Sequence, residues 1–230
     1  MFIHLFLLAI ACAGSDVVDD SEVITSHDSQ ETSTDEPSQD LFHFTTQSIP
    51  DSLRQVMAGV SWHEGCPVTL DELSLARFNY WGFDDEVHEG LLIVATSTAS
   101  VFESVFSTAF ESKFAFERIE PVSSFGGSDS ESMAANNTSA FNCRSVTSGS
   151  GWSQHSYGNA IDINPIQNPY VSGNTVLPPE GEAYLNRDST TKGLIVDGDP
   201  IVTAFTNAGW GWGGNWNSLK DYQHFSENGN

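Results

Sequence analysis

The chain has 230 residues, enough for one ordinary domain and an additional segment. Its net charge is −23, with only 8 Lys and Arg residues against 31 Asp and Glu residues. This balance excludes the basic surface that nucleic-acid-binding proteins need, and we expect no nucleic-acid partner.

Residues 1–12 open the chain with a short apolar run. The run is too short for a transmembrane helix, which needs about 20 residues, but it fits the apolar part of a signal peptide. Ala9-Ile10-Ala11-Cys12 resembles a bacterial lipobox, in which the cysteine receives lipid after cleavage. We expect an exported protein of the periplasm or cell envelope, with membrane contact only through lipid on Cys12. Simple secretion and a mis-assigned start are the alternatives.

Residues 13–47 are rich in Ser, Thr, Asp and Glu and poor in large apolar residues. Such a composition cannot bury enough surface to fold, which predicts a disordered acidic tether. The folded domain is expected over residues 48–230. It should begin with a short helix that has Ser48 near its N-terminus and Pro50 in its first turn.

The next elements predict an α+β fold, an antiparallel sheet with packed helices. Leu73 to Trp81 and Gly90 to Thr96 have strand composition and should form a hairpin around Asp84-Asp-Glu. Apolar residues between Thr98 and Lys113 recur at helical spacing, so we expect a helix packed on that sheet. Phe116 to Val122 is expected to be a further strand, Ser123 to Ser132 a loop, Pro165 to Thr191 a long loop region, and Asp199 to Ala208 a short helix.

Three cysteines remain to be assigned. If Cys12 carries lipid, Cys66 and Cys143 are left as an even pair in an oxidising compartment, which predicts a disulfide between them. The alternative, that they bind zinc, is disfavoured because neither belongs to a Cys-x-x-Cys pair.

The stretch from Ser153 to Asn164 carries the chemistry. His155 precedes a segment whose alternation predicts a strand, with Ala160, Asp162 and Asn164 on an open face and Ile161 and Ile163 in the core. Histidine and aspartate both bind Zn²⁺, whose catalytic sites use three protein ligands. His224, in Asp221-Tyr-Gln-His224, is the candidate for the third ligand. Asp221 would then be left to act as a base, provided that the chain bends between the two residues.

These two motifs resemble the M15 family of zinc peptidases, whose pattern is Ser-x-His-x6-Asp followed by Asp/Glu-x-x-His. Ser153, His155, Asp162, Asp221 and His224 stand at the matching positions, and the likeness covers roughly Cys66 to Ser226. It implies a hedgehog/DD-peptidase-like fold and a Zn²⁺ cofactor held by His155, Asp162 and His224. Aspartate at 221, where the dipeptidase branch usually has glutamate, favours the endopeptidase-like branch of the family, its subfamily C.

The resemblance also suggests roles around the zinc site. Asp221 would be the catalytic base, and Arg144 would polarise the scissile carbonyl or hold a substrate carboxylate. A surface ion pair is the alternative for Arg144. Ser153 and Gln154 would bind substrate or orient the ligands, or merely complete a turn. The segment from Trp210 to Trp216 could stack on a glycan or peptide, or simply be half-buried beside the site.

The predicted function is an exported zinc metallopeptidase that hydrolyses amide bonds of peptidoglycan stem peptides. It would act as a D-Ala-D-Ala carboxypeptidase or an L-Ala-D-Glu endopeptidase. A catalytically inactive, metal-stabilised cell-wall-binding or signalling module is the first alternative, and Asp221 and Arg144 argue against it because a pure binder needs neither. A periplasmic interaction protein without metal is the second.

Overall fold

The computed structural model describes residues 41–146 and 151–229. The predicted signal peptide, Cys12 and the tether as far as residue 40 lie outside the described residues. The tether boundary at residue 47 is wrong, because β1 (Phe44–Ser48) already belongs to the main sheet. This strand pairs with β2 along its whole length, and Phe44 packs on Phe78 with ring centroids 5.4 Å apart.

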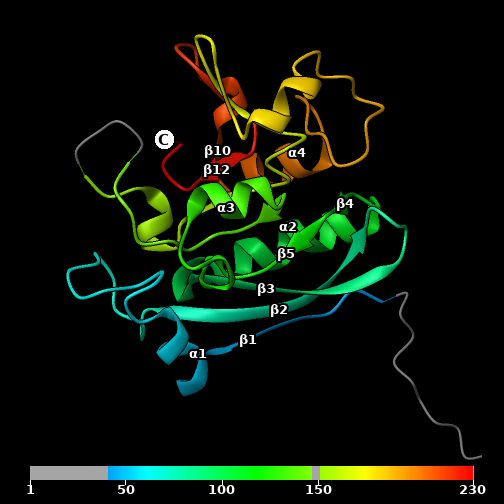
Figure 1. Ribbon diagram of the computed structural model, residues 1–230. Coiled ribbons are helices and arrows are strands. Elements are labelled where there is room, and N and C mark those ends of the chain that lie inside the picture. Colours follow the sequence, from blue (N-terminus) through cyan, green and yellow to red (C-terminus); the bar gives the residue numbers. More distant parts are fainter. Residues whose placement is uncertain (1–40, 147–150, 230) are drawn as a thin grey trace, which may run out of the picture. The chain divides into compact units, whose positions relative to one another are not determined.

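The main sheet is antiparallel in the order β1-β2-β3, with β2 (Leu73–Gly82) and β3 (Val87–Ala95) forming the predicted hairpin. A short strand, β4 (Ala115–Phe116), adds to the end of β2 in parallel. Helix α1 (Asp51–Met57) follows β1 and begins after Pro50 rather than near Ser48, which is part of the strand. Strands β1, β2 and β3 and helix α1 are drawn in the lower half of Figure 1.

Helix α2 (Ala99–Glu111) packs on the main sheet as its apolar spacing predicts, after a single 3₁₀ turn at η1 (Thr96–Thr98). Phe106 lies against Phe78 of β2 with ring centroids 4.1 Å apart. Helix α4 (Pro200–Asn207) packs on α2 and buries Ile201 and Phe205 in the same core. The phenylalanines of α2 are therefore core residues, as expected.

The C-terminal half of the chain contributes the strands of two small sheets. One is antiparallel in the order β10-β12-β7, built from β10 (Gly211–Trp212), β12 (His224–Ser226) and β7 (Ala160–Asp162). The other has the order β11-β8-β9, built from β11 (Lys220–Asp221), β8 (Tyr170–Ser172) and β9 (Thr175–Leu177). The predicted α+β class is confirmed; the more specific hedgehog/DD-peptidase-like architecture stays a prediction.

Three segments differ from expectation. The strand predicted after Phe116 is interrupted, and only β5 (Arg118–Ile119) follows β4, paired with β6 (Asn137–Thr138). The predicted loop from Ser123 contains η2 (Val122–Phe125) and helix α3 (Asp129–Ala134). Ser128 caps α3 by accepting a hydrogen bond from the Glu131 amide, which explains a helix in a Ser-rich segment. The long loop region contains the β8-β9 hairpin and η4 (Pro179–Tyr184).

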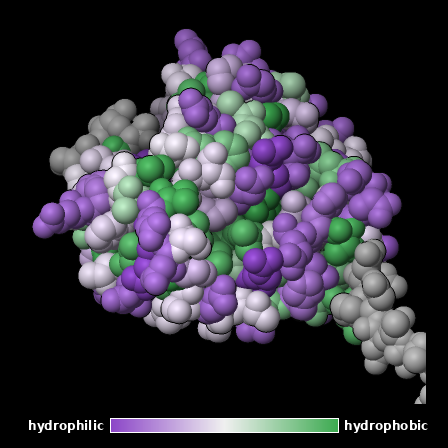
Figure 2. Space-filling model, turned by 60° about the horizontal axis from the view of Figure 1, so that its bottom comes forward, coloured by the Kyte–Doolittle hydropathy of each residue, from purple (hydrophilic) through white to green (hydrophobic). Residues whose placement is uncertain are grey.

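Hydrophobic and hydrophilic residues interleave on the face shown in Figure 2. Val56 of α1 and the nearby Val60 are among the exposed large apolar side chains of the domain. Among the helices of residues 41–146 and 151–229, none is long and apolar enough to cross a membrane.

Candidate functional site

The pairing of β7 with β12 brings together two of the predicted ligands. Asp162 and His224 stand directly opposite each other in this antiparallel pair, so their side chains share one face. On the other face, Ile161 lies opposite Phe225, and both are fully buried in the core. His224 Nδ1 is 3.0 Å from Asp162 Oδ1. The predicted alternation at Ile161 therefore fixes which way the carboxylate points.

Asn164 is the exception to that alternation. The strand ends at Asp162, and Asn164 adopts a left-handed backbone with φ 44°. Its amide donates to the carbonyls of Ala115, at 2.8 Å, and Gly193, at 3.0 Å. The prediction that Asn164 shares the open face with Asp162 is wrong, because these buried backbone acceptors draw its side chain into the fold.

His155 reaches the pair from η3 (Gln154–Tyr157), a short 3₁₀ turn. Ser153 precedes this turn, and its Oγ accepts a hydrogen bond from the His155 amide at 3.4 Å. Gly158 closes it with φ 73°, and a Cβ there would lie 2.5 Å from the backbone nitrogen of Ala95. Glycine is required at that position for the turn to pack against β3.

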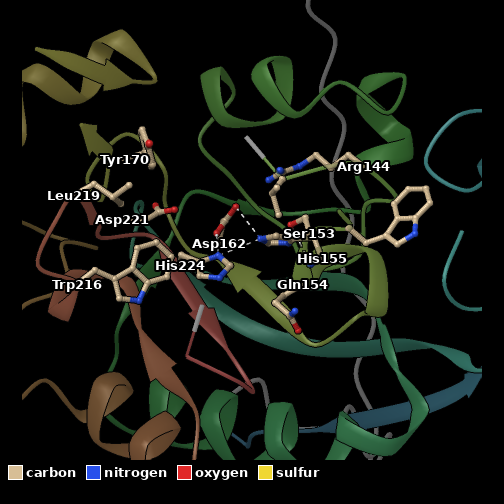
Figure 3. Close-up of a pocket in the computed structure, with 12 residues that line it drawn as sticks. Arg144, Ser153, Gln154, His155, Asp162, Tyr170, Trp216, Leu219, Asp221 and His224 are labelled. Atoms are coloured by element: carbon tan, nitrogen blue, oxygen red, sulfur yellow. Dashed lines mark hydrogen bonds and ion pairs between the residues drawn. The ribbon is translucent and has the colours of Figure 1, made fainter. Parts of the chain in front are cut away.

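The three side chains converge on one point (Figure 3). His155 Nε2 lies 3.2 Å from both Asp162 Oδ2 and His224 Nδ1, and all three residues are at most 7% exposed. His155 Nδ1 faces the carbonyl of Ala140, an arrangement that places the proton on Nδ1 and leaves the Nε2 lone pair toward the other two residues. The donor set of two imidazoles and one carboxylate fits a zinc ion with three protein ligands.

Electrostatics support the same reading of Asp162. Burial alone would raise the pKa of its carboxyl, but the adjacent imidazoles of His155 and His224 hold that pKa well below its usual value. The carboxylate is therefore in its charged form, as a metal ligand must be.

Asp221 stands beside the three residues at the end of β11, and a turn separates it from His224, as the predicted bend requires. Its Oδ1 atom is shielded from solvent and has no hydrogen-bond partner within the described part of the chain. Burial, and then the charge of Asp162, raise the pKa of the Asp221 carboxyl to about 7. A buried oxygen without a partner, beside a cleft, can accept a hydrogen bond from a group that enters the cleft.

Arg144 lies across the cleft from Asp221 (Figure 3). Its Nε pairs with Asp129 of α3 at 3.1 Å, so the ion-pair alternative describes a real contact, yet the side chain still lines the cleft. Its backbone is fixed as well, because the Arg144 amide donates to Ser156 Oγ at 2.9 Å.

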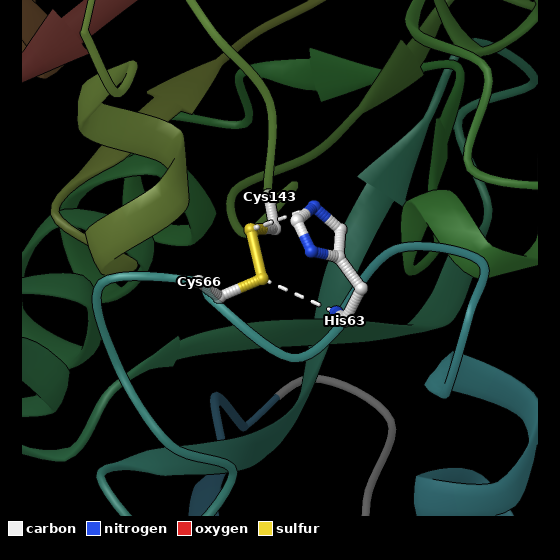
Figure 4. Close-up of side chains that lie close together, drawn as sticks. All are labelled: His63, Cys66 and Cys143. Carbon is white, nitrogen blue, oxygen red and sulfur yellow. Dashed lines mark hydrogen bonds between the residues drawn. A yellow bond between two sulfur atoms is a disulfide. The ribbon is translucent and has the colours of Figure 1, made fainter.

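Cys143, the residue before Arg144, forms a disulfide bond with Cys66 (Figure 4), so the predicted disulfide is confirmed. The bond joins segments 77 residues apart in sequence. His63 lies against it, with Nε2 3.6 Å from the Cys143 sulfur. Because both sulfurs are bonded to each other, neither is available as a thiolate ligand, which disfavours the zinc alternative for these cysteines.

The cleft in front of the three converging residues has a volume of about 240 Å³. Gln154, Trp152, Tyr170, Trp216 and Leu219 form its walls, together with Ser153 and the residues above. Gln154 and Ser153 are thus at the cleft, with Ser153 also supporting the turn that carries His155.

The Trp- and Gly-rich segment divides between core and cleft. Trp210 and Trp212 are buried, and Trp212 Nε1 donates to the carbonyl of Tyr222 at 2.9 Å, which fixes the turn between Asp221 and His224. Trp216 alone lines the cleft, with its ring 5.6 Å from that of His224. In η5 (Gly213–Asn215), a Cβ on Gly213 would lie 2.5 Å from the carbonyl oxygen of Asp221, so the close approach needs glycine.

Arg187 supports the same turn and is not recognisable from the sequence. Its guanidinium donates to the carbonyls of Gln167 and Ile195 and to Asn168 Oδ1, and it lies 4.1 Å from the centre of the Tyr222 ring. Burial lowers its pKa to about 10. The small number of basic residues in the sequence draws attention to each of them, but it does not indicate that Arg187 in particular supports the site.

Comparison with known proteins gives a family match over the segment that contains most of these residues. A family model described as D-alanyl-D-alanine carboxypeptidase, Peptidase M15, matches residues 147–227. This range includes the three converging residues and Asp221 but not Arg144. No curated protein and no solved structure matches the chain. Over this C-terminal segment, the chain is similar to the M15 family of peptidases.

Proposed function

We propose that the protein is an exported, zinc-dependent peptidase that hydrolyses amide bonds in peptidoglycan stem peptides. The observation that carries the proposal is one arrangement: three buried ligand atoms converge in a cleft, and an unpartnered carboxylate oxygen of Asp221 stands beside them. The family description favours removal of a terminal D-Ala, and cleavage between L-Ala and D-Glu is the other candidate bond.

His155, Asp162 and His224 would hold the zinc ion. When bound, zinc supplies a Lewis acid that makes water a nucleophile near neutral pH. The Ala140 carbonyl keeps the His155 ring in the orientation and tautomer that this role needs. The cross-strand pairing of Asp162 with His224 fixes the other two ligands on a sheet rather than on a mobile loop.

Asp221 would act as the general base. A pKa near 7 in the metal-free site means that its carboxyl can both accept and return a proton at neutral pH. A nearby cation would lower that pKa and favour the carboxylate that accepts a proton from the attacking water. The same group then gives the proton to the departing amine.

Arg144 would stabilise negative charge on the substrate. It is one of only 8 basic residues in the chain, and it faces a cleft that also contains Asp162 and Asp221. A guanidinium there can donate to the carbonyl oxygen as charge develops on it, or to a substrate carboxylate. The ion pair with Asp129, whose Oδ1 lies 3.1 Å from Arg144 Nε, favours this position of the guanidinium.

Export to the periplasm or cell envelope, and a lipid anchor on Cys12, complete the proposal. They rest on the composition of residues 1–12. The disulfide is consistent with an oxidising compartment.

Mass spectrometry of peptidoglycan fragments after incubation with the zinc-loaded protein tests the function. Loss of a terminal D-Ala establishes a carboxypeptidase, and a cut between L-Ala and D-Glu establishes an endopeptidase. D221A should form neither product while still binding zinc. If the unaltered protein binds zinc but releases no product from any fragment, the peptidase proposal fails and a metal-stabilised binding module replaces it.

A further inference from the structure

A second, smaller cavity opens beside the cleft between Arg144 and the β11-β12 turn. Its volume is about 40 Å³. Arg144, Asp162, Tyr170 and Asp221 line both this cavity and the main cleft, so the two spaces are neighbours. The rest of its wall comes from Asp129, Met133, Leu177 and Gln223. We call this cavity the side pocket.

The size of the side pocket limits what can enter it. A water-sized group needs about 10–15 Å³ of such space, so the pocket has room for about three. A methyl group and part of the adjoining backbone fit, whereas a branched or aromatic side chain does not. Met133 and Leu177 give the pocket an apolar part suited to a methyl group.

A buried acceptor gives the side pocket its polar part. Gln223 is 2% exposed, and its Oε1 has no hydrogen-bond partner among the described residues. Its Nε2 faces the sulfur of Met133 at 3.8 Å, so Oε1 is the end of the amide that remains to accept a hydrogen bond. Asp221, whose Oδ1 is also unpartnered, borders the same space. Buried acceptors without donors are costly, and a ligand that brings an N–H group would satisfy them.

We propose that the side pocket is an alanine-selective subsite, in which Leu177 and Met133 receive the methyl group of a substrate residue at the scissile bond and Gln223 Oε1 accepts that residue's backbone N–H. This inference rests on the proposed function, because it assigns part of the substrate to the same site. It identifies residues that set specificity and lie outside the metal ligands and the base.

Synthetic stem peptides in which each alanine is replaced in turn by leucine of the same chirality test the subsite. With the zinc-loaded full chain, kcat/KM should fall by about 100-fold for leucine at one position, as a pocket too small for the longer side chain implies. L177A should reduce this preference by about 10-fold. V176A is the matched control, since Val176 is the neighbour of Leu177 on β9 but does not line the pocket, and it should leave the preference unchanged.

The acceptor is tested separately. Q223M keeps the length of the side chain and removes Oε1, so kcat/KM for the alanine peptide should fall by about 10-fold, mainly through KM, with the alanine-to-leucine preference kept. The subsite is overturned if L177A and V176A have the same preference as the unaltered chain, or if Q223M leaves KM unchanged. The second result would mean that the pocket holds only water.

If the protein shows no peptidase activity, the subsite can still be tested separately from the proposed function. Binding of the alanine and leucine peptides can then be compared by calorimetry. Alanine-selective binding that L177A weakens and V176A does not would retain the subsite while the proposed function fails. Equal or absent binding of both peptides would remove the subsite as well.

Discussion

Replacing Asp221 with asparagine should change how the stability of the metal-free protein depends on pH. Burial, followed by the charge of Asp162, raises the pKa of this carboxyl from 3.8 to about 7 in the folded state. The folded protein therefore binds the proton more tightly than the unfolded chain does. The resulting stabilisation is fully present below about pH 4 and is lost as the pH rises through about 7. The D221N variant has no such carboxyl and should not lose it.

The size of the effect follows from the shift. A rise of roughly 3 pKa units corresponds to about 4 kcal/mol at about 1.4 kcal/mol per unit. Part of the side chain faces the solvent in the cleft, and screening reduces this value, so we expect about 2–4 kcal/mol. D221N should gain this much stability relative to the unaltered protein between pH 4 and pH 8.

Urea unfolding with a chelator present, at pH 4 and pH 8, measures the difference. D51N, at the exposed start of α1, controls for the loss of one negative charge. Saturating zinc should abolish the pH-dependent difference, because a cation beside Asp221 favours its charged form. If D221N and the unaltered protein differ equally at both pH values without metal, the reasoning about burial of Asp221 is refuted.

Three other predictions concern the residues that support the site. D129N should lower kcat/KM by about 10-fold, because Arg144 loses its ion-pair partner, and steady-state kinetics tests this. The free energy of unfolding, measured in urea, should change by less than about 1 kcal/mol because the ion pair is partly exposed. R187K should lower the free energy of unfolding by about 2–3 kcal/mol, because one ammonium cannot replace a guanidinium that donates to three acceptors and stacks on an aromatic ring. An unchanged midpoint in urea unfolding would contradict this. Replacing Cys66 and Cys143 by serine should lower stability by about 2–5 kcal/mol, and equal denaturation midpoints with and without the disulfide would count against it.

The elements with strong periodicity were predictable from the sequence. The β2-β3 hairpin and α2 follow from apolar residues at strand and helix spacing, because a single core buries one face of each. The candidate metal ligands were predictable for a different reason: their spacing matched a known family pattern.

The supports of the site could not be predicted, because their partners are distant in sequence. Arg187 binds backbone carbonyls, which leave no residue-type signature. Asp129 lies in a Ser- and Gly-rich stretch that indicated a loop, and only the cap at Ser128 reveals the helix. The alternating sequence pattern continues to Asn164, but the strand itself ends at Asp162 and Asn164 has a left-handed backbone. Tertiary hydrogen bonds outweighed the local pattern at Arg187 and Asn164, whereas a local cap decided the helix that contains Asp129.

The cross-strand position of Asp162 and His224 also has a consequence for folding. His224 lies 69 residues after His155, so a chain that has not yet paired β7 with β12 presents at most two of the three ligands. A slip of one residue in that pairing would turn His224 toward the core and Phe225 toward the cleft. Tight metal binding should therefore require that β7 and β12 have already paired. A bound ion would stabilise the correct strand register relative to one shifted by a single residue.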